Sequence, residues 1–102
     1  MSELLYIVTV TVDSEAVNEW LNWMTHHHIG DVVKTGYFDS AKIYKVMEPG
    51  AQAGQAFEIQ YVTTTEERLS QYQSLAAPAL KKEHGDLFGG RVTASRRVIQ
   101  KM

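Results

Sequence analysis

The sequence contains no cysteine and only two prolines among its 102 residues. Without cysteine, the chain can form no disulfide bond, no zinc–thiolate site and no cysteine nucleophile. No apolar run approaches the roughly 20 residues that a membrane-spanning helix needs. The N-terminal segment "MSELLYIVTV" also lacks the basic region of a signal peptide. These features favour a cytoplasmic protein with a single domain over residues 1–102, a length that buries a core without cross-links.

Charge of one sign is also scarce. The chain carries 10 Lys and Arg against 12 Asp and Glu, which gives a formal net charge of −2. Basic residues gather only near the C-terminus, at Arg91, Arg96, Arg97 and Lys101. A nucleic-acid-binding domain usually shows a stronger basic excess. We therefore expect no nucleic-acid partner and no membrane partner, and we interpret this cluster as the solvated or interface face of a strand.

Alternating and β-branched residues predict four strands, over residues 4–12, 37–47, 56–62 and 91–100. The first strand, "LLYIVTVTV", has apolar residues or threonine on both faces, which indicates that both faces are covered. The segment "EPGAQAGQ", residues 48–55, predicts a hairpin loop between the second and third strands. The segment "GAQAG" is followed by a predicted strand, whereas a phosphate-binding loop requires a helix at that place.

Helical spacing predicts one helix after the first strand. Asp13 or Ser14 is the expected cap. Gly30 is expected to loosen or break the helix, and Gly36 to end it. The predicted inward stripe contains Val17, Trp20, Leu21, Met24 and His28.

A capping box predicts the second helical region, with Thr64 as N-cap and Glu67 three residues later. Pro78 suits the first turn of a further helical piece. The inner face of that piece is predicted to carry Leu80, His84, Leu87 and Phe88. The order β-α-β-β-α-β predicts a ferredoxin-like α+β fold, an antiparallel four-stranded sheet with both helices on one face. Because the other face is apolar too, a second subunit is expected to cover it in a homodimer.

Several short motifs resemble those of one known family. They are "EWLNWM", "HHI", "YKV", "IQY" and "APALKKEH" followed by "DLFG". These motifs resemble short bacterial proteins catalogued as domain of unknown function 4286, over most of the chain from Tyr6 to Val98. The resemblance implies a dimeric α+β barrel of ferredoxin-like subunits, and it implies no assigned activity.

The chain departs from that family pattern at two positions. Gly30 stands where the family tends to have proline after His-Ile, and Ala76 stands where it tends to have histidine before "APAL". A chemical role of that histidine in relatives would be lost here. Broader relatives of the fold include cofactor-free monooxygenases, muconolactone isomerase-like enzymes, heme-degrading monooxygenases and stress-responsive dimers, but a shared fold does not fix function.

The run His26-His27-His28 raises the question of a metal site. Adjacent helical residues point about 100° apart, so the three rings cannot converge on one ion. His27 or His28 has ligand spacing with Asp31, and spacing alone reveals no third ligand. We therefore expect no metal, with His26 and His27 exposed near the helix end and His28 partly buried.

Inward-facing polar residues suggest a proton-transfer or ligand-binding site instead. A histidine of near-neutral pKa beside a carboxylate or a tyrosine hydroxyl could move protons. Trp23 lies off the inward stripe and is the better tryptophan for a pocket rim or interface. The candidate ligand-binding group is Trp23, His28, Tyr44, Glu58, Tyr61, His84 and Arg96. The alternative is that these polar side chains are simply hydrogen-bonded in or beside a dimer interface.

The sequence thus supports three functional hypotheses, and no cofactor is expected. The first is a homodimer that binds an apolar or aromatic small molecule or a partner. The second is a cofactor-independent enzyme of the monooxygenase or isomerase type that uses a histidine beneath the helices. The third is a domain that only oligomerises. A pocket of several hundred Å³ would favour the first two, and a closed helix–sheet interface would favour the third.

Overall fold

The computed structural model describes residues 3–51 and 53–102. The chain order is β1 (Leu4–Val12), α1 (Val17–Trp23), α2 (Ile29–Lys34), β2 (Ser40–Lys45), β3 (Gln55–Thr63), α3 (Glu66–Gln71), α4 (Ala77–Phe88) and β4 (Val92–Gln100). Single π-helical turns, Met24–His28 and Tyr72–Ala76, join α1 to α2 and α3 to α4. Two residues of the predicted domain's start, Met1 and Ser2, and Gln52 of the predicted loop lie outside the described residues.

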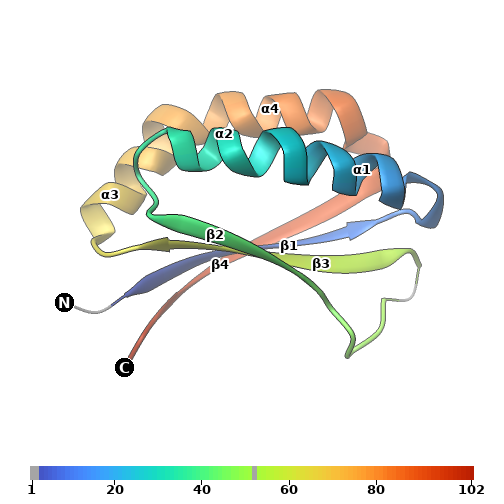
Figure 1. Cartoon of the computed structure of the whole chain (residues 1–102), viewed down its shortest axis with the longest axis horizontal. Coiled ribbons are helices and arrows are strands. Elements are labelled where there is room, and N and C mark those ends of the chain that lie inside the picture. The colour runs from blue at the N-terminus through green and yellow to red at the C-terminus, as the bar shows by residue number, and fades with distance from the viewer. Residues whose placement is uncertain (1–2, 52) are drawn as a thin grey trace.

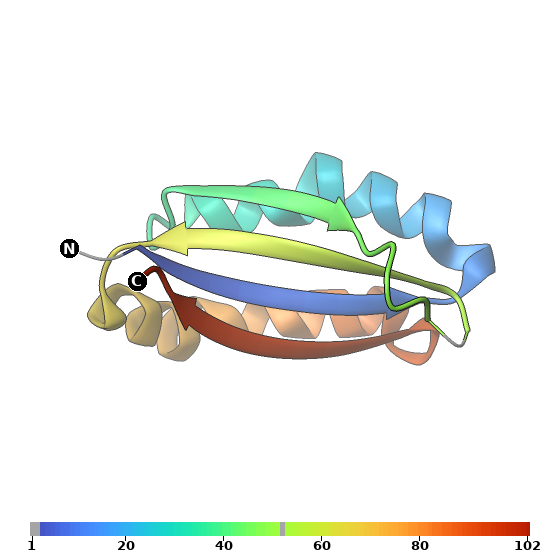
Figure 2. The same cartoon turned by 90° about the horizontal axis from the view of Figure 1, so that it is seen from below.

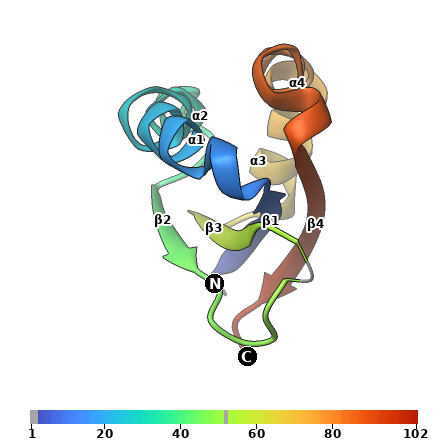
Figure 3. The same cartoon turned by 90° about the vertical axis from the view of Figure 1, so that its right-hand side faces the viewer.

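The four strands form one antiparallel sheet in the order β2-β3-β1-β4. Both rows of helices cover the same face of this sheet, as Figure 1 and Figure 3 show. Figure 2 shows the opposite face, which carries no helix. The predicted ferredoxin-like βαββαβ fold is therefore confirmed. None of the helices in the described parts of the chain is long and apolar enough to cross a membrane.

Alternation along β1 fills the space between sheet and helices. Tyr6, Val10 and Val12 point toward the helices and are buried, as are Phe57 and Ile59 of β3. The helices close this core with several large side chains, namely Trp20, Met24, Val32, Leu69, Tyr72 and Phe88. Burial of apolar side chains of this size stabilises a fold by roughly 1.5–3 kcal/mol each. The sheet surface under the helices is thus apolar except at the positions that carry polar side chains.

The bounds of several elements differ from those predicted. β2 is shorter than residues 37–47, because Tyr37 and Phe38 turn into the core before the strand begins at Ser40. Gly30 does not break the helix, which continues to Lys34 and ends at Gly36 with φ +88°. One glycine costs a helix only about 1 kcal/mol, and the buried Val32 beyond it holds the segment.

Two further details correct the sequence analysis. Leu87 is 48% exposed and does not belong to the inner face of α4. Neither Asp13 nor Ser14 caps through its side chain. The backbone carbonyl of Asp13 instead accepts a hydrogen bond from the Ala16 N–H at 2.9 Å and starts a short 3-10 turn. In the loop between β2 and β3, Gly54 has φ +76°, and a Cβ atom at this position would clash with the Val12 carbonyl.

The N-cap of α3 is Thr65 rather than Thr64. Its hydroxyl accepts a hydrogen bond from the Arg68 N–H at 3.1 Å. We expect Thr65→Ala to lower the free energy of unfolding by about 1 kcal/mol, because an N-H at the helix start loses its acceptor. The neighbouring Thr64→Ala should change it by less than about 0.5 kcal/mol, since Thr64 is exposed. Urea unfolding of the two variants tests this, and equal losses would contradict the assignment.

Candidate functional site

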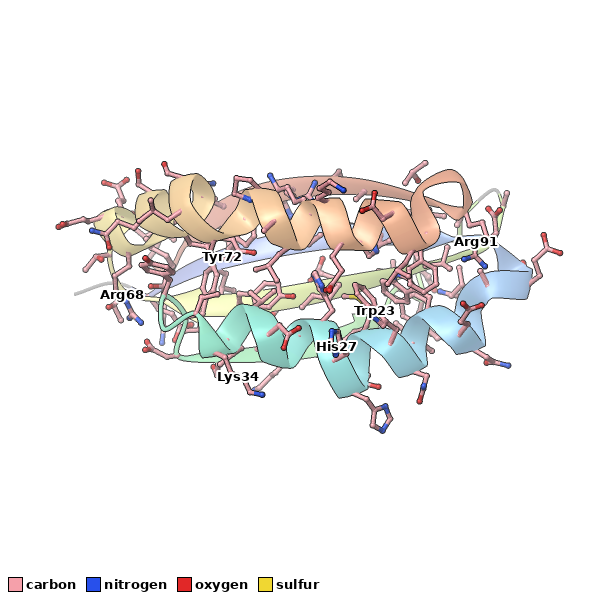
Figure 4. The ribbon with its side chains drawn as sticks, turned by 90° about the horizontal axis from the view of Figure 1, so that it is seen from above. Trp23, His27, Lys34, Arg68, Tyr72 and Arg91 are labelled. Atoms are coloured by element: carbon pink, nitrogen blue, oxygen red, sulfur yellow. The ribbon has the colours of Figure 1, made fainter. Side chains whose placement is uncertain are left out.

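A narrow crevice lies between the two rows of helices and the sheet. Its polar lining comes from three strands and both rows of helices: Tyr6, His28, Tyr61, Tyr72, Lys81, His84 and Arg96. Its volume is about 30 Å³, which is room for about one water molecule. Figure 4 shows Tyr72 and Trp23 in the space between the two rows of helices.

Strand pairing explains how Arg96 reaches this crevice. Arg96 of β4 lies opposite Val8 of β1, on the helix-facing side of the sheet. Most of β4 is exposed, because the helices do not fully cover this edge strand. The Arg96 guanidinium forms no salt bridge with any carboxylate of the described residues. It is therefore a positive charge directed toward tyrosine and histidine side chains.

Both histidines of the crevice contact a tryptophan of α1. The Trp20 indole N–H donates a hydrogen bond to Nε2 of His84 at 2.9 Å. The Trp23 ring stacks on His28, with centroids 4.7 Å apart, and on His84, with centroids 5.7 Å apart. The Nδ1 atom of His28 is buried and has no hydrogen-bond partner among the described residues. Because His28 ends a π-helical turn, its position fits the frequent use of such turns at functional sites.

Burial holds the crevice side chains in their neutral forms. Desolvation, together with a smaller effect of the nearby His84, lowers the pKa of His28 to about 4. Desolvation, followed by the charge of Arg96, also lowers the pKa of His84. In the other direction, desolvation raises the pKa of Tyr72 to about 12 and raises that of Tyr6, against the opposing charge of Arg96. At neutral pH the crevice thus combines the cationic side chains of Arg96 and Lys81 with neutral histidine and tyrosine side chains.

The structure brings His28, Tyr61, His84 and Arg96 together, but it separates Tyr44 and Glu58 from them. Tyr44 is 45% exposed and pairs across the sheet with Glu58. Both lie on the helix-free face, because Ile43 and Ile59 beside them face the core.

On that face Glu58 already has partners. It accepts a hydrogen bond from Gln60 at 2.8 Å and lies 3.6 Å from the Arg97 guanidinium. Neither Tyr44 nor Glu58 can join a site in the crevice of the same chain.

The sequence analysis missed Tyr6, Tyr72 and Lys81 as lining residues. Tyr6 lies on the same, helix-facing side of β1 as Val8 and Val10, so alternation along β1 could have identified it. Tyr72 could not be distinguished from an ordinary core residue by its spacing. Trp23 lines a separate, open depression of about 570 Å³ on the outside of the helices. Its ring packs against His28 and His84, which line the crevice, so the three rings together separate this outer groove from the crevice.

Comparison with solved structures supports the fold. An ethyl tert-butyl ether d (EthD) family protein from Bacillus halodurans superposes with a TM-score of 0.71 at 13% identity, covering 97% of this chain and 99% of that one. SnoaB, a cofactor-independent oxygenase from Streptomyces nogalater, gives a TM-score of 0.70 at 10% identity over 97% and 92%. A candidate antibiotic biosynthesis monooxygenase from Bacillus cereus gives 0.68 at 12% over 99% and 94%.

These neighbours define the class as an α+β protein with the fold of the dimeric α+β barrels. Residues 3–102 match the family described as domain of unknown function, DUF4286, and the chain belongs to this family. The resemblance inferred from the sequence motifs is thereby confirmed. A search of the curated proteins finds none that matches. The family and the fold leave the function to be argued from the site itself.

The lowered pKa of His28 predicts a loss of stability in weak acid. The unfolded chain takes up a proton near pH 6.5, whereas folded His28 resists protonation until about pH 4. The stabilising contribution is therefore complete above pH 6.5 and is lost as the pH falls toward 4. Between pH 7 and pH 5 we expect a loss of about 1–2 kcal/mol from this group. The charges facing His28 are those of Asp31, which opposes the shift, and of His84, His27 and Arg96, which support it.

Urea unfolding at several pH values tests this expectation. His28→Gln should flatten the dependence of the unfolding free energy on pH, leaving the part due to His84. His26→Gln is the matched control, because His26 is exposed on the same turn. If both substitutions flattened the curve equally, the burial of His28 would not be the cause of the pH dependence.

His27 belongs to an exposed cluster with Asp31 and Glu83, whose ligand atoms all lie within 4.8 Å of one another. Glu83 comes from α4, so sequence spacing could not reveal it as a third group. The Nε2 atom of His27 lies 3.2 Å from Asp31 and 3.7 Å from Glu83. Exposed ion pairs of this kind contribute only about 0–1 kcal/mol.

We retain the prediction that this cluster is not a metal centre. The double variant His26→Gln/His27→Gln should unfold within about 1 kcal/mol of the wild type, because only exposed contacts are lost. Elemental analysis of the purified proteins provides the second measurement. Stoichiometric zinc in the wild type that disappears from the variant, together with a clear fall in Tm, would refute the prediction.

Proposed function

We propose that this protein is a homodimer that binds an apolar or aromatic small molecule at the crevice beneath the helices. The observation that carries the proposal is the set of polar side chains around Arg96. A region needed only for packing would be filled with apolar side chains, because unpaired polar groups are costly to bury. Here Tyr6 is buried and His28 and His84 are half-buried, and the Nδ1 atom of His28 has no hydrogen-bond partner among the described residues. The guanidinium of Arg96, an exposed residue of the edge strand, faces them without a carboxylate partner among those residues. Convergent polar groups within an apolar surround are typical of ligand sites.

The small volume of the crevice limits how a ligand can bind. Ligand pockets usually measure roughly 300–1,000 Å³, whereas this crevice measures about 30 Å³. Volume alone therefore favours the domain that only oligomerises, and the binding proposal rests on the polar lining. The crevice as it stands admits only the polar group of a ligand. The apolar part would have to separate the helices or lie against Trp23 in the outer groove, which Phe88 also lines.

The helix-free face of the sheet supports the homodimer. Its partly exposed apolar side chains are those of Leu5, Val62 and Ile99, and strand pairing places them on one face with the buried Ile7. Ile99 is 41% exposed in the single chain. A contiguous apolar patch is rarely left open on a monomer, and a two-fold axis would bury it symmetrically against a second copy. Together with the lack of cysteine, this supports a cytoplasmic homodimer.

The alternative is a cofactor-independent enzyme of the monooxygenase or isomerase type. The fold favours it, because the structure of SnoaB, a cofactor-independent oxygenase, shares this fold. His28 is unprotonated at neutral pH and can accept a proton from a bound molecule, but its pKa of about 4 makes it a weaker base than the near-neutral histidine expected from the sequence. In this alternative Arg96 would stabilise the negative charge left on the molecule after proton transfer. Binding and catalysis would then use the same crevice.

Native mass spectrometry of freshly purified protein tests the proposal. We expect twice the chain mass of 11.5 kDa, with a small molecule retained per subunit. Arg96→Gln should reduce its retention at least tenfold, because the charge in the crevice is lost. Arg97→Gln is the matched control, since the adjacent side chain lies on the opposite face of β4.

The outcomes separate the hypotheses. A dimer without any retained molecule would favour a domain that only oligomerises, and a monomer at micromolar concentration would contradict the architecture. Retention that is equal in the Arg96 and Arg97 variants would remove the crevice from the proposal. Incubating the retained molecule with the protein in air then distinguishes binding from catalysis. An enzyme would convert it, and His28→Gln would stop the conversion.

A further inference from the structure

The hydrogen bond from Trp20 to His84 determines which nitrogen of His84 carries its proton. An indole N–H can only donate, so Nε2 of His84 must supply the lone pair for the 2.9 Å contact. The neutral imidazole then carries its single proton on Nδ1. Trp20 is completely buried, so a protonated Nε2 would leave two N–H groups facing each other away from water. This contact keeps His84 neutral in addition to the desolvation described above.

His84 is consequently a hydrogen-bond donor toward any ligand and not a base. Its lone pair is occupied by Trp20, and its Nδ1–H has no acceptor among the described side chains. Arg96, which also lines the crevice, can only donate. Tyr6 and Tyr72 stay protonated, because burial raises the pKa of each hydroxyl. Donors therefore outnumber acceptors in the crevice, and two of the lining residues, Arg96 and Lys81, are cationic donors.

We infer that the crevice recognises an acidic oxygen of its ligand, so that the ligand is a small organic acid, a carboxylic acid or an ionised enol or phenol. The anionic oxygen would lie between the Arg96 guanidinium and His84 Nδ1–H, where charge-assisted hydrogen bonds are strongest. Trp20 acts as the positioning residue that fixes His84 as a donor. The inference rests on the proposed small-molecule site and specifies its ligand class.

The dimensions of the crevice agree with this ligand class. A volume of about 30 Å³ suits a single head group and not a ring. An apolar remainder of the ligand would extend beyond it, past Leu80 and Lys81 at the crevice wall. His28 is then the remaining imidazole with a free lone pair, since its pKa is lowered and no described residue bonds its Nδ1. A ligand that also carries a donor, as a hydroxy acid does, could use it.

The first experiment reads the tautomer of His84 directly in the wild-type protein. Long-range 1H–15N NMR spectra distinguish a protonated from an unprotonated ring nitrogen. At pH 7 we expect His84 to carry its proton on Nδ1 alone. Trp20→Phe should restore a mixture at His84. If that variant does not fold, the wild-type spectrum alone decides, and a proton on Nε2 of His84 would overturn the inference.

The second experiment uses benzoate and its uncharged analogue benzamide as probes, followed by the same histidine signals. Benzoate should bind at least tenfold more tightly than benzamide, and Arg96→Gln should remove that preference while Arg97→Gln keeps it. Equal binding of the two probes would overturn the acid class and leave a small-molecule site intact. If neither probe moves the signals of His28 and His84, the inference fails as well. The proposed function would then stand or fall on the native mass spectrum.

Discussion

The contact between Trp20 and His84 is the interaction on which the candidate site depends. It joins α1 to α4 across the helix-covered face of the sheet, 64 residues apart in the chain. Leaving the buried indole N–H without an acceptor would cost roughly 1–3 kcal/mol, so the histidine is held in one orientation. Its ring contacts both Trp23 and His28, and the three ring centroids form a triangle with sides of 4.7, 5.7 and 5.8 Å. The two histidines are thus fixed by two tryptophans of one helix.

These contacts explain why two tryptophans and a histidine triplet lie so close together in the sequence. Trp20 and Trp23 are one helical turn apart, and His28 follows after a π-helical turn that adds a residue to the turn. The first tryptophan points into the core, and the second contacts both histidines at the edge of the crevice. His26 and His27 point outward and are exposed. The segment is therefore part helix core and part site wall, and only one of its three histidines reaches the crevice.

Alternation in the sequence was sufficient to predict the sheet and the parity of β4. β1 begins and ends at the predicted residues, because nine uninterrupted β-branched, aromatic and apolar residues leave little freedom. The shared parity of Arg96 with Val92 and Val98 was also readable, since alternation along one strand is fixed by geometry. The inward direction of His28 followed in the same way from helical spacing. These are properties of single elements, which sequence patterns describe well.

Properties that depend on two elements were not readable. Alternation along a strand shows only which residues share a face with Glu58 or with Tyr44. The pairing of β2 with β3 decides that this shared face is the helix-free one. Glu83 meets His27 only because two helices pack side by side. The N-cap shifted from Thr64 to Thr65 because adjacent threonines offer the same chemistry. The volume of the crevice depends on all these contacts together, so no residue pattern could predict it.

Alternate side chains of β4 point to the helix-covered face and to the helix-free face of the sheet. Arg96 faces the crevice, whereas Arg97 and Ile99 face the side proposed to meet a second copy. In the single chain almost every residue of β4 is exposed, although β1 beside it is largely buried. An edge strand with few buried contacts opens more readily than the centre of a sheet. In the proposed dimer, burial of Ile99 would hold β4 in place and with it the Arg96 guanidinium. The position of the Arg96 guanidinium in the crevice would then depend on the contact between two chains.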